Sequence, residues 1–287
     1  MALRVALVAE DAGVRGAMAR AFQGAPPDWE VTLHDVPPQD ADVVVAGPEF
    51  ESVPGIRFDC RAPQRALEEV EAAVADRPGR TYVVTAAVGG AGTTTLALHL
   101  AASLAGTAPT CVLDLDARGG VAARLGLADD HLTWREDGSV PVAGGFRALP
   151  SPEDARPDEF APALERAAAV FERVVVDAPD REALEVAARA ARAAVLVLTP
   201  TVPSALRSRA LLDRHTDCNW AIVSNRTGPG GELLCSELED RLAHRVALEL
   251  PCSPALRDAE DDCRLLAHRW TRYLRGVRTL AERLELV

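Results

Sequence analysis

Short apolar runs alternate with segments of helical spacing along most of this chain. The expected strands are residues 83–85, 110–116, 145–149, 173–177, 194–198, 220–224 and 245–250. The expected helices follow them at residues 93–106, 160–171, 181–192, 203–214 and 231–243. Regular alternation of this kind requires a parallel sheet covered by helices on both faces. The sequence therefore predicts an α/β protein with a doubly wound, mostly parallel sheet.

The first 76 residues repeat the pattern on a smaller scale. Strands are expected at residues 3–9, 29–34 and 42–46, and helices at residues 12–23 and 64–76. Arg77, Pro78 and Gly79 then have the composition of a linker. We therefore predict a small α/β domain over residues 1–76, a linker over 77–80 and a larger domain over 81–287.

Composition narrows the class of protein. The 287 residues are 48% hydrophobic and 26% charged, which is typical of a globular chain. The formal net charge of −12 argues against a basic nucleic-acid-binding surface. No apolar run approaches the roughly 20 residues of a transmembrane helix, and the N-terminal run ends at Glu10 and Asp11, so we expect no signal peptide. Six scattered cysteines without a C-x-x-C pair predict reduced thiols in a cytoplasmic protein.

A glycine-rich loop between a strand and a helix is the main candidate site. The strand ends at Thr85, and the loop contains Gly89, Gly90, Ala91 and Gly92. Thr93, Thr94 and Thr95 open the helix. Free N–H groups at a helix start point toward an anion, and glycines let the backbone wrap closely around it. The order therefore predicts a phosphate-binding loop; the alternative is a glycine-rich turn without a ligand.

The loop departs from the usual P-loop pattern G-x-x-x-x-G-K-[ST]. Ala87 stands at the first glycine and Thr93 at the lysine, while Gly92 and Thr94 are in place. The chain contains no lysine, so no other lysine can replace the missing one. The stretch also resembles the deviant P-loop of the ParA/MinD family, K-G-G-x-G-K-T-[ST]. Val88 and Thr93 replace both lysines of that pattern, and the CpaE/TadZ branch of the family commonly has Thr at the second position.

Acidic residues follow two of the expected strands. Asp114 and Asp116 are spaced i, i+2, so their side chains point to one side at the carboxyl end of a strand. Asp177 ends another strand, where a carboxylate can hold Mg²⁺ beside the Thr94 hydroxyl. These positions resemble the D-x-D and D-x-P motifs of the ParA/MinD family. The resemblance implies that Asp116 orients the attacking water and that Asp114 supports the Mg²⁺ shell; the alternative is a pair of solvated strand ends.

Asn225 and Arg226 follow a later strand. The ParA/MinD family often has Asn-Arg at this point, where the amide reads the adenine edge. The resemblance therefore implies nucleotide contacts by the loop and by this pair, that is, by Gly89, Gly90, Ala91, Gly92, Thr93, Thr94, Thr95, Asn225 and Arg226.

The N-terminal segment resembles a response-regulator receiver domain. An acidic pair, Glu10 and Asp11, follows the first strand, as it does in that family. The third strand runs into Gly47 where receivers have their phosphorylated Asp, so we expect no phosphorylation there. CpaE and TadZ proteins carry such an atypical domain before their ATPase domain. The acidic pair has two interpretations, a cation site or a solvated strand end.

The resemblance as a whole implies a positioning or scaffold protein of the MinD/CpaE type, for septum-site selection or for localisation of a pilus or secretion system. Since both lysines are missing, we expect weak or absent ATP hydrolysis, with ATP and Mg²⁺ as the implied cofactors. The implied partners are a second copy of the chain and proteins of division, pilus or secretion assemblies, with recruitment to a pole, septum or inner membrane face. The alternative is an active switch ATPase that cycles between monomer and dimer, in which an arginine such as Arg118 replaces the lysine.

Two further features have alternative interpretations. The expected last helix, residues 269–285, has one apolar stripe of Trp270, Leu274, Val277, Ala281 and Leu284, flanked by arginines. MinD proteins attach to membranes through a basic amphipathic C-terminal helix, but we favour packing of this stripe on the sheet. Trp134, in a polar loop, is expected to pack rather than to contact a partner.

Overall fold

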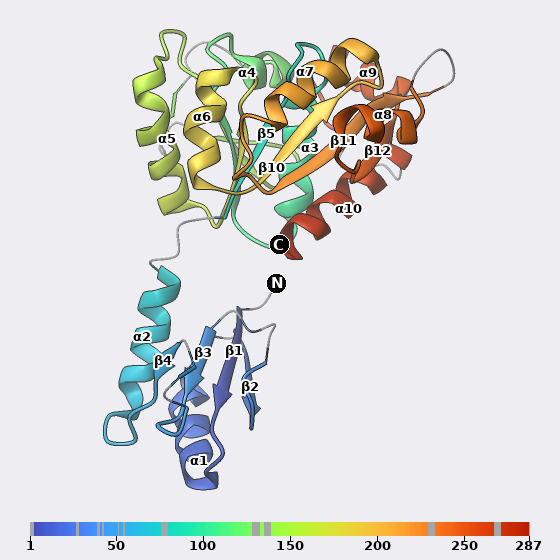
Figure 1. Cartoon of the computed structure of the whole chain (residues 1–287). Helices are drawn as coiled ribbons and strands as arrows, with labels where there is room; N and C mark the ends of the chain where they lie inside the picture. The colour runs from blue at the N-terminus through green and yellow to red at the C-terminus, as the bar shows by residue number, and fades with distance from the viewer. Residues whose placement is uncertain are drawn as a thin grey trace. The chain divides into compact units, whose positions relative to one another are not determined.

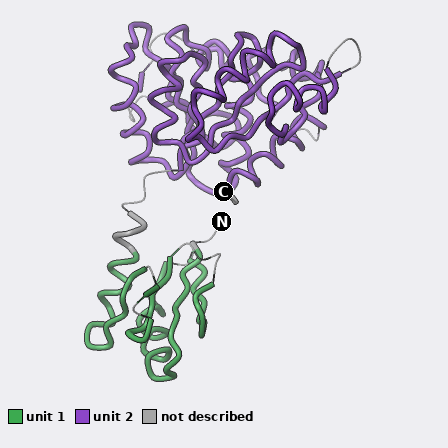
Figure 2. The backbone as a smooth tube through the Cα atoms, viewed as in Figure 1, with its two compact units in different colours: residues 1–78 green, residues 79–287 purple. Residues whose placement is uncertain are grey.

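The computed structural model describes residues 3–26, 29–38, 41, 43–50, 52, 53, 55–75, 80–127, 133, 134, 139–228, 233–266 and 271–286. The chain forms two compact units, residues 1–78 and 79–287 (Figure 2). Each unit has its own sheet and its own apolar core.

The first unit contains a four-stranded parallel sheet with the order β2-β1-β3-β4. Its elements are β1 (Leu3–Val8), α1 (Ala12–Ala21), the 3₁₀ helix η1 (Phe22–Gly24), β2 (Trp29–His34), β3 (Val43–Ala46), β4 (Ile56–Arg57) and α2 (Pro63–Ala75). Strand β4 was not predicted, because two residues are too short for a periodic pattern. Asp42, the expected start of β3, lies outside the described residues.

The acidic pair after β1 has local partners. Asp11 is the N-cap of α1, and its Oδ1 accepts a hydrogen bond from the Val14 N–H at 2.9 Å. The Glu10 N–H donates to the Glu49 carboxylate at 2.8 Å. A capping role explains the aspartate at this position without a bound cation.

The second unit contains an eight-stranded sheet with the order β12-β11-β10-β5-β9-β6-β8-β7. All neighbouring strands are parallel except β7 and β8. The strands are β5 (Arg80–Thr85), β6 (Thr110–Asp114), β7 (Val140–Pro141), β8 (Arg147–Leu149), β9 (Arg173–Asp177), β10 (Ala191–Leu198), β11 (Trp220–Thr227) and β12 (Leu248–Pro251). The predicted α/β fold with a mostly parallel sheet is confirmed for this unit.

Helices cover both faces of this sheet (Figure 1). One face carries α3 (Thr93–Leu104), α4 (Gly120–Leu125), α9 (Pro254–Asp261) and α10 (Arg272–Leu286). The other carries α5 (Pro157–Val170), α6 (Arg181–Ala190), α7 (Val202–Leu212) and α8 (Cys235–Leu242). Successive strand residues alternate between the two faces, so Val84 packs in the core of the first face and Val83 in that of the second.

Some boundaries differ from the predictions for local reasons. Strand β6 ends at Asp114 rather than 116, because the Asp116 N–H turns back to the Asp114 carboxylate at 2.9 Å. Helix α8 ends because Ala243 adopts a left-handed conformation with φ 54°. Strand β12 then begins at Leu248 rather than at the predicted residue 245. The short helices α4 and α9 were missed, since six and eight residues carry little periodicity.

Helix α10 packs on the sheet beside α3, as favoured from the sequence (Figure 1). Its buried side chains are Tyr273, Val277, Leu280, Ala281 and Leu284. Arg269 and Trp270, which belong to the predicted helix, lie outside the described residues. The described part of the apolar stripe is therefore buried in the core of the larger unit.

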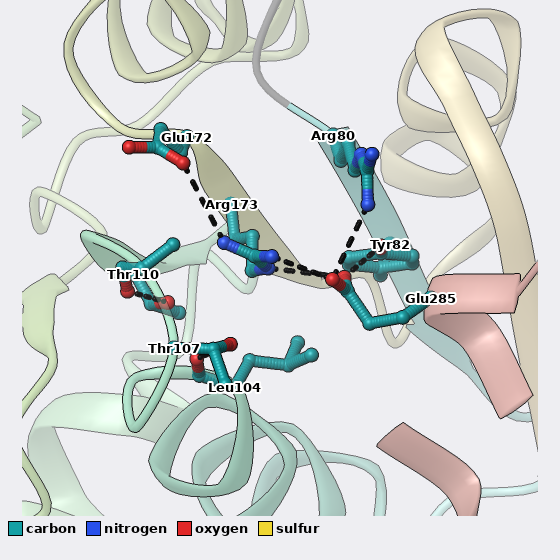
Figure 3. Close-up of polar contacts among 9 residues, drawn as sticks. Arg80, Tyr82, Leu104, Thr107, Thr110, Glu172, Arg173 and Glu285 are labelled. Atoms are coloured by element: carbon teal, nitrogen blue, oxygen red, sulfur yellow. Dashed lines mark hydrogen bonds and ion pairs between the residues drawn. The ribbon is translucent and has the colours of Figure 1, made fainter. Parts of the chain in front are cut away.

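A buried ion cluster joins the end of α10 to the amino ends of two central strands (Figure 3). Arg173 of β9 contacts the Glu285 carboxylate through Nε at 3.0 Å and Nη2 at 2.5 Å. Tyr82 of β5 donates to the same carboxylate at 2.5 Å, and Arg80 contacts it at 3.2 Å. Burial alone would raise the pKa of Glu285, but hydrogen bonds from Arg173 and Tyr82 and the arginine charges outweigh burial, so the pKa is lowered.

This cluster predicts that the charge of Glu285 has a large effect on the free energy of unfolding. Glu285→Ala should lower the free energy of unfolding by about 3 kcal/mol, because it leaves Arg173 buried without its main charge partner. Glu282→Ala, on the exposed side of the same helix, should stay within about 0.5 kcal/mol of wild type. Urea denaturation at neutral pH measures both variants, and equal stabilities would contradict the prediction.

The same pair predicts the pH dependence. Because the folded-state pKa of Glu285 is lowered, its contribution is complete above the unfolded-state pKa of about 4.3 and is lost as the pH falls through the folded-state value. The stability difference between wild type and Glu285→Ala should therefore shrink only in acid.

Candidate functional site

The glycine-rich loop joins the central strand β5 to α3. Gly92 is the N-cap of α3 with φ +101°, and Gly90 has φ +76°, both in the left-handed region that favours glycine. Gly89 and Gly90 are exposed, whereas Thr93 and Thr94 are partly buried. The loop therefore has the strand–turn–helix geometry that the sequence predicted, with the first turn of α3 at its end.

Asn225, near the carboxyl end of β11, bonds to this loop. Its buried amide donates from Nδ2 to the Ala91 carbonyl at 2.8 Å, and its Oδ1 accepts from the Arg226 N–H at 2.9 Å. Gly92 leaves room for the amide, since a Cβ added there would lie 2.5 Å from Nδ2. The group expected to read an adenine edge is thus bonded to the loop backbone.

Three oxygen atoms converge above Gly120 at the start of α4. The Thr94 Oγ1, an Asp116 Oδ2 and an Asp177 Oδ2 lie 3.0, 3.4 and 3.7 Å from the position that a Cβ on Gly120 would take. They come from α3, from the segment after β6 and from the end of β9. The absence of a side chain at Gly120 leaves this space open to all three.

Asp177 is the least satisfied residue of this group. Both carboxylate oxygens are buried without a hydrogen-bond partner among the described residues. Burial raises the pKa of Asp177 to about 7, and the charge of Asp116 adds to the rise. The nearby Thr94 hydroxyl lowers this pKa, although its geometry does not meet that of a hydrogen bond. Unpaired carboxylate oxygens beside a hydroxyl are ligands that Mg²⁺ prefers.

A cation here would need further ligands. Within the described part of the chain, no three His, Cys, Asp or Glu side chains lie close enough together to hold a metal ion. Mg²⁺ is commonly held by one or two carboxylates together with phosphate oxygens and waters. Thr94 and Asp177 fit that mode, in which most ligands come from a bound phosphate compound.

Asp114 has a structural role that the sequence did not predict. Its two oxygens accept the backbone N–H groups of Asp116 and Val121, each at 2.9 Å. They therefore hold the segment between β6 and α4. Burial, and next the charge of Asp177, raise the pKa of Asp114. The backbone carbonyl of Asp114 also accepts a hydrogen bond from the Trp134 indole at 2.8 Å, and Trp134 is buried, which confirms that it packs.

Asp116 is paired with Arg118. One carboxylate oxygen accepts from the Arg118 backbone N–H at 3.0 Å and from its Nε at 2.9 Å. The Arg118 side chain remains 78% exposed. The arginine considered as a replacement for the lysine therefore lies beside the converging oxygens of Thr94, Asp116 and Asp177.

Glu260 is a site residue that sequence reasoning missed. Its carboxylate accepts a hydrogen bond from the Thr95 hydroxyl, in the first turn of α3, and pairs with Arg124 at 2.8 Å. Glu260 also lines a cavity of about 180 Å³ together with Gly92, Thr95, Asn225, Arg226 and Arg257. Helix α9, which positions it, was not predicted, and no motif marks this glutamate.

These features define a class of fold. A glycine-rich loop leads from a central parallel strand into a helix, and acidic side chains lie at the carboxyl ends of the adjacent strands β9 and β6. This is the P-loop ATPase fold, and in particular the fold of the MinD and ParA proteins, as comparison with solved structures shows.

The septum site-determining protein MinD from Pyrococcus horikoshii OT3, solved with Mg-ADP, matches with a TM-score of 0.64 and 16% identity over 72% of this chain and 96% of that one. The MinD cell division protein of Aquifex aeolicus matches with a TM-score of 0.61 and 21% identity over 72% and 97%. A ParA family ATPase from Chlorobium tepidum TLS matches with a TM-score of 0.61 and 17% identity over 71% and 98%.

Sequence comparisons add one match. The profile of the family described as ATPase MipZ matches residues 80–206, which include the glycine-rich loop, Asp116 and Asp177. Comparison with curated proteins gives no match.

The loop geometry makes a prediction about its glycines. Gly92→Ala should lower the free energy of unfolding by about 1–3 kcal/mol, because it combines a left-handed backbone with a contact to the Asn225 amide. Gly89→Ala should have little effect, since a Cβ there meets no atom within 4 Å. Chemical denaturation compares the two, and equal losses would contradict the assigned geometry.

Proposed function

We propose that this protein is a positioning or scaffold protein of the MinD/CpaE type whose nucleotide site is degenerate. The shared fold and the MipZ profile support the ParA/MinD part of the proposal. Thr93 at the second lysine position supports the CpaE/TadZ branch, and Val88 at the first is a further departure from the family pattern. Its role would be to mark a septum site, or the place of a pilus or secretion assembly.

One observation supports the proposal that the nucleotide site is degenerate. Polar groups that would contact a nucleotide already form hydrogen bonds to other groups of the protein. The Thr95 hydroxyl donates to Glu260, and the Asn225 amide donates to the Ala91 carbonyl. Glu260 adds a negative charge to the cavity beside the loop. This carboxylate would repel a bound phosphate; its ion pair with Arg124 offsets part of the repulsion, and neither lysine is present to offset the rest.

The proposed partners follow from the resemblance. A second copy of the chain and proteins of a division, pilus or secretion assembly are the expected partners, and the first unit would dock rather than accept phosphate, since Gly47 follows β3. Among the described helices none is long and apolar enough to cross a bilayer. Recruitment to a pole, a septum or the inner membrane face belongs to the same proposal, with membrane association peripheral at most.

The second candidate is an active switch ATPase. The unpartnered oxygens of Asp177 beside Thr94 favour it, because they suit Mg²⁺ and have no other partner among the described side chains. The ion would neutralise phosphate charge when bound. Asp116 would orient water, and Arg118 or a partner's arginine would supply the missing positive charge.

ATP turnover separates the two candidates. Purified protein should bind MgATP weakly or not at all, with turnover near background. Val88→Lys combined with Thr93→Lys should raise affinity, measured by calorimetry, more than it raises turnover. Val88→Leu with Thr93→Ser is the control without added charge. Turnover by wild type at a rate ordinary for switch ATPases would reject the degenerate site.

Removing the charge of Glu260 tests whether this carboxylate opposes nucleotide binding. Glu260→Gln keeps the side-chain shape and should raise affinity for MgATP about tenfold, since it removes repulsion worth at least 1.4 kcal/mol. Asp258→Asn makes the same change on the exposed side of α9, away from the cavity lining, and should leave affinity unchanged. If both variants bind like wild type while the lysine variant binds more tightly, Glu260 does not oppose the nucleotide.

A further inference from the structure

A larger cavity lies on the other side of the sheet from α3. It has a volume of about 310 Å³, and its walls come from α6, α7, the end of β5 and the segment after β9. It shares no lining residue with the cavity of Glu260. Its size is at the lower end of the range for small-molecule sites, about 300–1,000 Å³.

Positive charge gathers around this cavity in an acidic protein. Arg181, Arg207, Arg214 and His215 line it, against the single carboxylate of Asp180. Asp180 caps α6 by accepting the Ala183 N–H at 2.9 Å, and Arg181 is paired with Glu185 at 2.7 Å. The chain as a whole carries a formal charge of −12.

Two of these arginines have no partner among the described residues. Within the described part of the chain, the side chains of Arg207 and Arg214 form neither a hydrogen bond nor an ion pair. By contrast, Arg209 between them bonds to Asp213 at 2.8 Å and to the Leu242 carbonyl at 2.8 Å. Arg209, which does not line the cavity, is therefore paired, whereas the two arginines that line it have no partner among the described residues.

The spacing of the pair suits one ligand. Arg207 and Arg214 are seven residues apart, about two helical turns, so they lie on one face of α7 and its C-terminal extension. Ala210, a small residue, and Leu211 lie between them. The negative end of the α7 dipole accounts for a cation at Arg214, but not for Arg207 in the middle of the helix.

We propose that this cavity binds a small organic phosphate. A phosphate monoester carries a charge of about −1.5 to −2, which matches the two unpaired guanidinium groups, whereas one carboxylate would leave a positive charge unbalanced. Leu184, Leu211, Ala86 and Pro179 form apolar walls for the rest of the molecule. The site would lie against both Ala87, which leads into the glycine-rich loop, and the segment that follows Asp177. This inference goes beyond the proposed function and does not depend on it.

Trp220 provides a local reporter. Its indole N–H donates to the backbone carbonyl of His215, a lining residue, at 2.8 Å. Full-length protein is titrated with inorganic phosphate at constant ionic strength, and binding is followed by calorimetry and by tryptophan emission. We expect saturable binding with an emission change that Trp220→Phe removes.

The variants decide the location of the bound phosphate. Arg207→Gln and Arg214→Gln should each weaken binding about tenfold or more, because each removes a charge-assisted contact. Arg189→Gln makes the same change on an exposed part of α6 outside the cavity and should bind like wild type. Thr94→Ala, in the first turn of α3 beside the glycine-rich loop, should also retain binding at this cavity.

Three outcomes would overturn the proposal. Loss of binding in Thr94→Ala, with full binding in the arginine variants, would place the phosphate at the glycine-rich loop. Equal weakening in Arg189→Gln would indicate an adventitious ion only. Binding of a glutamate-rich peptide at Arg207 and Arg214, without binding of phosphate, would make the cavity a docking site for an acidic protein segment.

Discussion

Two carboxylates buried side by side constrain the working edge of the larger sheet. Asp114 and Asp177 are register partners at the ends of β6 and β9. Burying a charged group is costly unless hydrogen bonds or a counter-ion compensate. Asp114 is compensated by the backbone of the segment that leads into α4, so that segment and the start of α4 are held in place. Among the described residues Asp177 has no such hydrogen-bond partner, so its buried carboxylate next to Thr94 is left without compensation from the backbone.

The polar groups on the two sides of the glycine-rich loop differ in whether they already have hydrogen-bond partners. On the side of β9 and β6, oxygens converge on open space above Gly120. On the side of β11 and α9, Asn225 and Glu260 are already bonded to the loop and to α3. The oxygens that would contact a cation are therefore unpaired among the described residues, while polar groups that would contact the rest of a nucleotide are already bonded within the protein.

Sequence reasoning succeeded where the signal is local. The structure brings the loop, Asp116 and Asp177 together because each follows an apolar strand and parallel strands bring their carboxyl ends to one edge; their roles stay predictions. Sequence reasoning failed for Glu260 and for the Asn225 contact to Ala91, because those pairs are separated by 165 and 134 residues and no pattern in the chain links them. The stripe of the last helix could serve either a membrane surface or the sheet, and the sequence analysis favoured the sheet. What distinguishes them is Glu285, one acidic residue whose partners lie in β5 and β9.

The ion cluster at Glu285 also bears on how the chain folds during synthesis. Arg80 and Tyr82 belong to the first strand of the larger unit, yet their carboxylate partner lies more than 200 residues later. Domains generally fold as units, with the N-terminal one first. The smaller unit has all its strands within residues 3–57 and can form early, whereas the charge of Arg173 remains uncompensated until the last turn of α10 leaves the ribosome. The larger unit therefore completes its core only once α10 has emerged, so its earlier strands stay incompletely packed for longer than those of the smaller unit.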